Sequence, residues 1–274
     1  MSVTITAADI NKLRQTTGAG MLDCRKALTE SNGDFEAAID WLRKQGQKVA
    51  AKRSDREAKE GVVIAQTTAD YKSGIVLCIS CETDFVSKNA EFVAFAQSIA
   101  DAAIANNVKT TEELNAVSVN GSTVAELIND KLAAIGEKIA VSKFERVDAP
   151  YVASYIHGAN RMGVLVAMTK EAAEAGKDVA MQIAAMNPLA VDETSISPET
   201  IAREKEIAIE QIKAEGKPAE MAEKIAMGKV NKFFKENTLL AQAFVKDNSK
   251  SVADYLKSVD TDLKVTDFKR VALG

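Results

Sequence analysis

Proline and cysteine are scarce in this sequence: four prolines and three cysteines occur among 274 residues. The low proline content, together with alanine-rich stretches that alternate with lysine and glutamate, favours helix over most of the chain. Three cysteines without a pairing pattern are typical of a protein in a reducing compartment, which argues against a disulfide-stabilised secreted fold.

Apolar runs of membrane-spanning length are also missing. Runs such as Ile75–Ile79 and Val164–Met168 have the length of a strand, far below the ~20 residues that cross a bilayer. The segment Met1–Thr6 has neither a basic leader nor an apolar core, so we expect no secretory signal. The default expectation is a cytoplasmic protein that makes no membrane contact.

An excess of basic charge is lacking as well. The formal net charge is −4 at pH 7. Because a nucleic-acid binder neutralises phosphates with a basic face, this charge argues against direct nucleic-acid binding. The chain length predicts two or three domains with a substantial core.

Residues 5–46 have the apolar spacing of three short helices. Thr6 and Asp9 resemble a capping box at the start of the first helix, which Gly18 ends. The apolar stripe of the third helix ends at Gly46. So small a unit buries little surface by itself, and we interpret residues 1–46 as a helical docking module.

Residues 47–60 alternate basic and acidic side chains and contain few apolar residues. We interpret this segment as a solvated linker that can be helical. The alternative is a specific binding patch.

Two segments of the sequence repeat a strand–strand–helix pattern. Gly74-Ile-Val-Leu-Cys-Ile-Ser80 in the first copy corresponds to Gly163-Val-Leu-Val-Ala-Met-Thr169 in the second. The pattern predicts one α+β core built of two related halves, residues 61–150 and residues 151–196 with 239–274. The expected elements are strands at 61–67 and 74–80 and a helix at 89–105, then strands at 151–156 and 163–169 and a helix with Val179, Ile183 and Met186 on one face.

Residues 197–238 are helical in pattern throughout. Ser197 is an expected N-cap, with Pro198 at the first helical position. Two helices joined by the turn at Gly216-Lys217-Pro218, the second carrying Met221, predict an antiparallel hairpin that projects from the core. Beyond it we expect a short helix at 251–258 and a last strand at 263–273.

Cys78 and Cys81 form the pattern closest to a redox or metal site, Cys-x-x-Cys. Both lie on or at the end of an expected strand, where a spacing of three points the side chains to opposite faces. A redox pair normally stands at a helix start, and no second pair completes a zinc site. We therefore interpret both as buried structural cysteines.

His157 is the only histidine. Nothing in its spacing places it beside a thiol, as nucleophilic catalysis would require. Gly18-Ala-Gly20 lacks the Gly-Lys-Ser/Thr of a phosphate-binding loop. The sequence thus predicts neither an enzyme active site nor a cofactor.

The segment Thr83-Asp84-Phe85-Val86, between an expected strand and the helix at 89–105, allows two interpretations. Phe85 can staple the helix to the sheet while Asp84 caps a helix, which the residues alone favour. Alternatively, the segment presents an aromatic beside an acid at a loop tip, as a wedge between a partner's helices requires. The pair Met21-Leu22 poses the same choice between core and docking surface.

Several long motifs resemble the translation elongation factor Ts family. They occur in the family's order from about residue 5 to 271. They are Thr17-Gly-Ala-Gly-Met-Leu-Asp-Cys-Arg-Lys-Ala-Leu28, Asn32-Gly-Asp-Phe-Glu-Ala-Ala-Ile39, Cys81-Glu-Thr-Asp-Phe-Val86, Tyr155-Ile-His-Gly158 with Gly163-Val-Leu165, and Leu240-Ala-Gln-Ala-Phe-Val-Lys-Asp247.

The resemblance implies a ubiquitin-associated-like (UBA-like) helical domain at 1–46, the two-part core, and a helical hairpin (coiled-coil) module at 197–238. It implies that the partner is elongation factor Tu, in GDP-bound and nucleotide-free forms, and that the outcome is GDP release without chemistry by this chain. In some relatives the hairpin is linked with self-association, so it also implies a possible homodimer.

The resemblance also implies roles for single residues. Asp84 and Phe85, flanked by Thr83 and Val86, would enter between helices of the GTPase domain and disturb its magnesium site. The resemblance therefore favours Phe85 as an exposed wedge over Phe85 as a staple between helix and sheet. The other partner contacts would be Arg14, Met21 and Leu22 near the nucleotide pocket, and His157 toward the partner's third domain.

Two departures from the family accompany the resemblance. Ala241 and Ala243 stand where many relatives carry Glu and Pro. The sequence stops at Gly274, just after the expected last strand, so we expect it to lack an extra carboxy-terminal helical module that some relatives have. The competing hypotheses are an interaction scaffold that binds through residues 1–46 without driving exchange, and an enzyme that uses Cys81 and His157.

Overall fold

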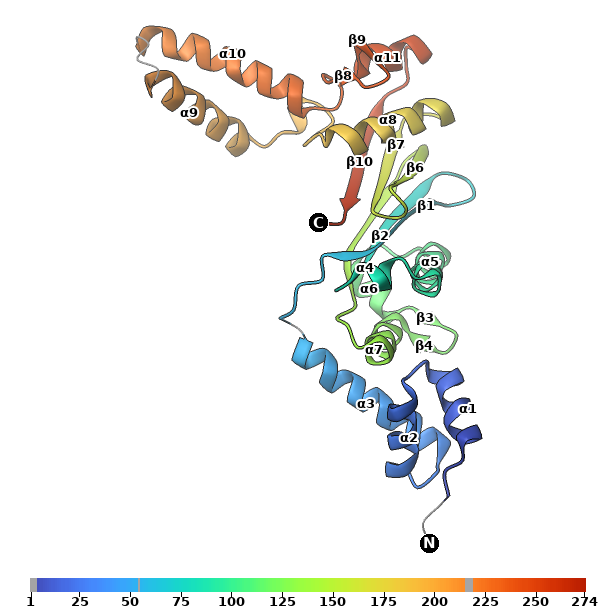
Figure 1. The fold of residues 1–274 in the computed structure, drawn as a ribbon. Coiled ribbons are helices and arrows are strands. Elements are labelled where there is room, and N and C mark those ends of the chain that lie inside the picture. Colours follow the sequence, from blue (N-terminus) through green and yellow to red (C-terminus); the bar gives the residue numbers. More distant parts are fainter. Residues whose placement is uncertain (1–3, 54, 215–218) are drawn as a thin grey trace.

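Helices lie at both ends of a central pair of antiparallel sheets in the computed structural model (Figure 1), which describes residues 4–53, 55–214 and 219–274. The expected α+β class is confirmed. The expected turn at 216–218 lies outside the described residues.

The amino-terminal helices are α1 (Ala7–Thr17), α2 (Met21–Glu30) and α3 (Phe35–Arg53). The capping box of Thr6 and Asp9 forms, and Gly18 ends α1 in the left-handed conformation with φ 69°. Leu13, Cys24 and Leu28 are buried in the small core between these helices.

Helix α3 continues past Gly46, where its apolar stripe was expected to end, as far as Arg53, so the first part of the segment 47–60 is helical. Gly46 is instead a contact point with α7 (Val124–Ile135): a β-carbon there would lie 2.8 Å from Cβ of Ala133 and 3.3 Å from the carbonyl oxygen of Asn129. The glycine permits close helix packing here and does not stop the helix.

The first half of the core is a three-stranded sheet of order β1-β2-β5 with helices on one face. The sequence patterns assigned no element between 106 and 150, yet this segment supplies the third strand and α7. The strands are β1 (Glu60–Thr67), β2 (Ser73–Cys81) and β5 (Ala140–Asp148); the helices are α4 (Asp84–Ser87), α5 (Ala90–Ala105), α6 (Thr111–Ala116) and α7; and a small pair, β3 (Ser118–Val119) and β4 (Ser122–Thr123), precedes α7.

The second half repeats this plan with a sheet of order β10-β7-β6, covered by α8 and α11. Val179 and Ile183 are buried as expected, but Met186 is 46% exposed because it is the last residue of its helix. The elements are β6 (Tyr151–His157), β7 (Met162–Met168), α8 (Ala173–Met186), the 3₁₀ turn η1 (Glu193–Ser195), β8 (Ala243–Phe244), β9 (Asp247–Ser251), α11 (Val252–Val259) and β10 (Val265–Ala272).

The two sheets pack against each other through an apolar layer that contains Val76 and Cys78 from the first and Leu165 and Ala167 from the second. The middle strands β2 and β7 are therefore covered on both faces, which explains why each reads as an uninterrupted apolar run.

The two glycines that open the repeated motif lie in this layer. A β-carbon on Gly74 would lie 2.8 Å from Cγ1 of Val152, and one on Gly163 would lie 2.9 Å from Cγ1 of Val63 and from Cγ2 of Val76. Each glycine thus makes room for side chains of the opposite sheet.

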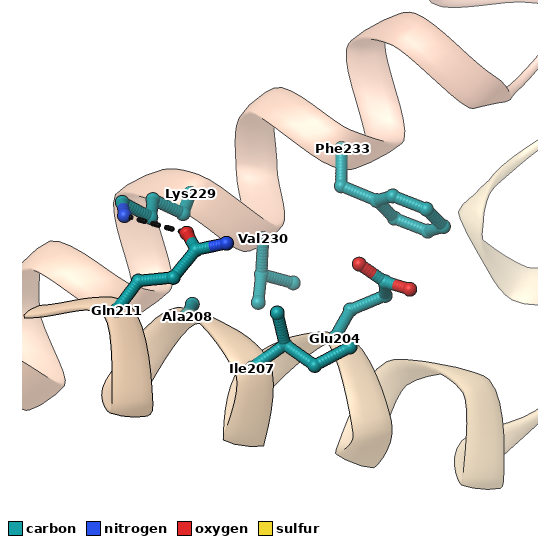
Figure 2. A pocket seen from close by; sticks show the side chains of 7 residues that line it. All are labelled: Glu204, Ile207, Ala208, Gln211, Lys229, Val230 and Phe233. Atoms are coloured by element: carbon teal, nitrogen blue, oxygen red, sulfur yellow. Dashed lines mark hydrogen bonds between the residues drawn. The ribbon is translucent and has the colours of Figure 1, made fainter.

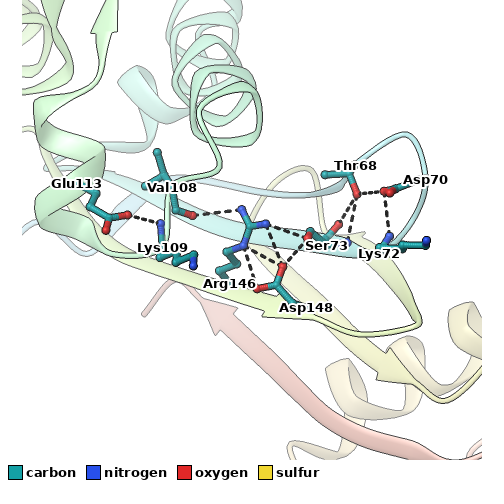
Figure 3. Close-up of polar contacts among 9 residues, drawn as sticks. All are labelled: Thr68, Asp70, Lys72, Ser73, Val108, Lys109, Glu113, Arg146 and Asp148. Atoms are coloured by element: carbon teal, nitrogen blue, oxygen red, sulfur yellow. Dashed lines mark hydrogen bonds and ion pairs between the residues drawn. The ribbon is translucent and has the colours of Figure 1, made fainter.

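A polar network fixes the end of the first sheet where β1 turns into β2 and where β5 ends (Figure 3). The Arg146 guanidinium, on β5, donates to Oγ of Ser73 at 2.8 Å and to the Val108 carbonyl at 3.3 Å. It also pairs with the Asp148 carboxylate, and this hydrogen bond holds the pKa of Asp148 below its ordinary value. Arg146 therefore ties β5 to β2 and to the segment between α5 and α6.

The helical hairpin consists of α9 (Pro198–Ala214) and α10 (Ala219–Asn237) and projects from the second half (Figure 1). The Ser197 hydroxyl accepts from the backbone N–H of Thr200, as the N-cap prediction requires. Ala208, Ile212 and Ala226 form its narrow buried seam. A small hollow beside the seam is lined by residues such as Ile207 and Phe233 (Figure 2).

We expect Gly163→Ala to destabilise the protein by about 1–3 kcal/mol, because the added methyl group overlaps valine side chains of the facing sheet. Urea unfolding measures this loss. Gly228→Ala is the control: Gly228 lies inside α10 with open space around it, so alanine should stabilise by up to about 1 kcal/mol. Equal stability of the two variants would contradict the packing described.

Candidate partner-binding site

The segment Thr83–Val86 lies at the start of a single helical turn, α4 (Asp84–Ser87), between strand β2 and helix α5. Thr83 stands at the N-cap position in extended conformation, and the interpretation of Asp84 as the cap is wrong because Asp84 is the first helical residue. The Asn89 side chain accepts from the backbone N–H of Glu91 and starts α5 anew. The local sequence thus confines α4 to one turn.

Phe85 is 86% exposed, the most exposed of the large apolar side chains in the described residues. The staple interpretation of Phe85 is therefore wrong. Val86 takes that role, because it packs against the core under α5, and Ser87 is buried. Val86 and Ser87 therefore anchor the turn to the core, while Phe85 points into solvent.

Asp84 lies beside Phe85 and pairs with Lys88, one helical turn later. The Lys88 ammonium lies 2.7 Å from Oδ2 of Asp84, and this hydrogen bond and charge hold the pKa of Asp84 below its ordinary value. The Lys88 side chain is largely exposed and that of Asp84 is about half exposed. The turn therefore carries an ionised carboxylate next to an exposed aromatic ring.

The carboxylate of Glu137 holds the chain just before the turn. Its Oε2 accepts from the backbone N–H groups of Glu82 at 3.1 Å and Thr83 at 3.0 Å, and its Oε1 accepts from the Thr83 hydroxyl at 2.6 Å. In the opposite direction, Oε1 of Glu82 accepts from the backbone N–H of Lys138 at 2.6 Å. Residues 82–83 and 137–138 are thus joined by reciprocal hydrogen bonds.

Sequence reasoning missed Glu137. It lies 54 positions after Thr83 in a segment to which no element was assigned. The only feature of the neighbouring sequence that marks Glu137 is its position directly after Gly136, which ends α7 in the left-handed conformation.

Cys78 and Cys81 lie on opposite faces of β2, as their spacing predicted. Cys78 faces the layer between the sheets, and Cys81 faces the core under α5. Burial, with the nearby charges of Glu137 and Glu60, raises the pKa of Cys81 to about 12, and burial also raises the pKa of Cys78. The two thiols are neutral and separated, which does not suit redox or nucleophilic chemistry.

His157 ends strand β6 and is exposed, with Nδ1 3.0 Å from the Tyr155 hydroxyl. The turn that follows is fixed to β1: the Asn160 carbonyl accepts from the backbone N–H of Val63. The Arg161 guanidinium donates to Glu60 at 2.8 Å.

The same turn lies near α4. The hydrogen bond to Glu60 raises the pKa of Arg161, and the charge of Asp84 adds a smaller effect in the same direction. The structure therefore brings the β6–β7 turn and the Phe85 turn to the same end of strand β1.

Arg14, Met21 and Leu22 lie where α1 ends and α2 begins. Met21 is 55% and Leu22 81% exposed, so both belong to the surface and not to the core; Arg14 is exposed too. A β-carbon on Gly18, in the intervening turn, would lie 3.7 Å from Cβ of Ala134 on α7.

Helix α7 therefore links the region of the exposed pair Met21-Leu22 to the turn that carries the exposed Phe85. Its last turn contacts the amino-terminal helices, and Glu137, two residues after its end, holds the Phe85 turn.

Within residues 4–53, 55–214 and 219–274, no cluster of His, Cys, Asp and Glu has the arrangement of a metal site. In the same ranges, no helix combines the length and apolar character needed to cross a membrane.

Residues 82–274 match the family model described as Elongation factor TS. Similar curated proteins cover nearly the whole chain, and each is named elongation factor Ts. The protein of Flavobacterium psychrophilum is 52% identical over 99% of this chain and 99% of its own length. That of Christiangramia forsetii is 50% identical over 98% and 99%, and that of Clostridium perfringens is 45% identical over 98% and 93%.

We expect Phe85→Ala to change the free energy of unfolding by no more than about 0.5 kcal/mol, because the ring is exposed. Phe92→Ala is the matched control: this ring, on the next helix, is 2% exposed, and its loss should cost about 3–5 kcal/mol. Chemical denaturation of both variants measures the difference. A large loss in Phe85→Ala would restore the staple interpretation.

We expect the cysteine thiols to react slowly with iodoacetamide at pH 8, because burial raises the pKa of all three. Mass spectrometry of the labelled protein, with and without denaturant, measures the protection. Rapid labelling of Cys81 in the native protein would contradict its placement.

Proposed function

This chain belongs to the elongation factor Ts family and has a role in translation elongation, and we propose that it binds GDP-bound elongation factor Tu and promotes GDP release. In this proposal Phe85 and Asp84, supported by Thr83 and Val86, enter between helices of the GTPase and disturb its magnesium site. The chain itself catalyses no chemical reaction and needs no cofactor.

The observation that carries the proposal is the presentation of Phe85. A large aromatic ring that is 86% exposed on a short, anchored turn contributes little to its own fold. Exposed aromatic residues of this kind are typical anchors of protein interfaces, where they fill a pocket on the partner. The adjacent Asp84 carboxylate adds a charge at the same tip.

The physical basis of exchange is thermodynamic linkage. A GTPase holds GDP through backbone amides around the phosphates and through a magnesium ion that neutralises them. A protein that binds the nucleotide-free form more tightly weakens nucleotide binding by the same factor. Burial of the Phe85 ring can supply ~1.5–3 kcal/mol, and each ~1.4 kcal/mol of differential affinity is tenfold.

We assign the remaining predicted contacts to two further surfaces. Met21 and Leu22, with Arg14, are an exposed apolar pair next to a positive charge, suited to a second contact with the GTPase domain. His157 lies at the end of β6 and suits a contact with another domain of the partner. Self-association through the hairpin and residence in the cytoplasm stay predictions.

We expect catalytic amounts of the chain to accelerate the release of a fluorescent GDP from elongation factor Tu. Phe85→Ala should slow the accelerated rate by about tenfold or more, and Asp84→Ala by less, because the ring contributes more buried area. Stopped-flow fluorescence measures both rates.

The control for this experiment is Leu189→Ala, which removes another exposed apolar side chain far along the chain and should leave the rate unchanged. Binding of elongation factor Tu without GDP release would support the scaffold hypothesis instead. The absence of both binding and release would overturn the proposal.

A further inference from the structure

The position of Phe85 depends on backbone that Glu137 holds. Because the ring is exposed, the packing of its own side chain does little to fix where it points. The regular pairing of β1 with β2 ends at Cys81, so the backbone N–H groups of Glu82 and Thr83 lie beyond the last strand pair. One half-buried carboxylate accepts from both groups and from the Thr83 hydroxyl.

Hydrogen bonds to a charged acceptor are shorter and stronger than neutral ones. The backbone N–H groups of Glu82 and Thr83 donate to one oxygen of the Glu137 carboxylate, and the Thr83 hydroxyl donates to the other. These bonds fix the backbone path just before Phe85. Cys81, directly before Glu82, is anchored by burial, and its thiol donates to the Thr83 carbonyl at 3.2 Å. The turn is therefore held on its sheet side by Glu137 and on its helix side by Val86.

The same segment connects the Phe85 turn to the amino-terminal helices. Ala133 and Ala134 in the last turn of α7 approach Gly46 and Gly18, and Glu137 is the second residue after this helix. The backbone of Arg56, before β1, is held there too, because its carbonyl accepts from the Lys138 ammonium at 2.9 Å. One short stretch, residues 133–138, thus sets the spacing between the Met21-Leu22 surface and Phe85.

We propose that Glu137 is a positioning residue for nucleotide exchange: it holds the Phe85 turn in its binding orientation in the free protein. The inference rests on the function proposed above. A turn that is already oriented in the free protein loses less conformational freedom when it binds. More of the binding free energy of Phe85 is then left to favour the nucleotide-free state of the partner over its GDP-bound state.

The test compares three variants in the GDP-release assay. Glu137→Ala removes every acceptor and should lower kcat/KM by about tenfold, the size expected for lost charged hydrogen bonds. Glu137→Gln should stay within about threefold of the parent, because its amide oxygen can still accept from both N–H groups. Glu113→Ala is the matched control: its carboxylate also accepts a backbone N–H, that of Lys109 at 2.7 Å, but away from the turn.

A double-variant cycle separates positioning from general stability. In the Phe85→Ala background, Glu137→Ala should cost less than about twofold further, because the group that it orients is gone. Amide hydrogen exchange of the free protein supplies a second readout. Protection at Glu82 and Thr83 should fall in Glu137→Ala and stay unchanged in Glu113→Ala.

The outcomes distinguish the two proposals. Independent, multiplicative effects of the two substitutions, or full activity of Glu137→Ala, would overturn the role of Glu137 while leaving the proposed function intact. If the parent protein does not accelerate GDP release, the proposed function and this inference both fail. Loss of amide protection without loss of exchange would reduce Glu137 to a structural residue.

Discussion

The packing of two sheets across Gly74 and Gly163 is the constraint on which the rest of the structure depends. Each glycine leaves space for valine or leucine side chains of the opposite sheet, so the two halves approach closely enough to share one apolar layer. That contact fixes β2 and β7 on both faces. Because strand β2 leads directly into the Phe85 turn, and the turn after β6 is fixed to β1, the sheet contact also fixes where the exposed residues lie.

Much of the fold could be predicted from the sequence because its signals are local. The capping box at Thr6 and the N-cap at Ser197 depend on neighbouring residues, and the repeated motifs at Gly74 and Gly163 revealed the two halves. Strand β5 was missed because lysine, glutamate and arginine interrupt its apolar residues: only one face of this edge strand is well covered. The packing role of Gly46 was missed because it depends on α7, which the local pattern does not contain.

The candidate site shows the same division between local and distant information. The motif around Phe85 identified the turn, but the residues alone favoured a buried ring, since aromatic side chains are usually buried. Val86 fills the position that was expected of Phe85. Glu137 could not be found by spacing, because its partners lie 54 and 55 positions away and the carboxylate has no motif of its own. Only the folded chain brings them together.

A rigid base for an exposed ring follows from what an exchange factor has to do. A binding protein shifts a partner's equilibrium only by the difference between its affinities for the two states. A ring on a mobile loop can adapt to both states and loses that difference. Hydrogen bonds to Glu137 and the packing of Val86 restrict the turn without covering the Phe85 ring, whereas packing of the ring itself would bury the surface that the partner needs. The carboxylate and Val86 thus meet two requirements together, a fixed backbone and an exposed Phe85, that packing of the ring itself could not meet.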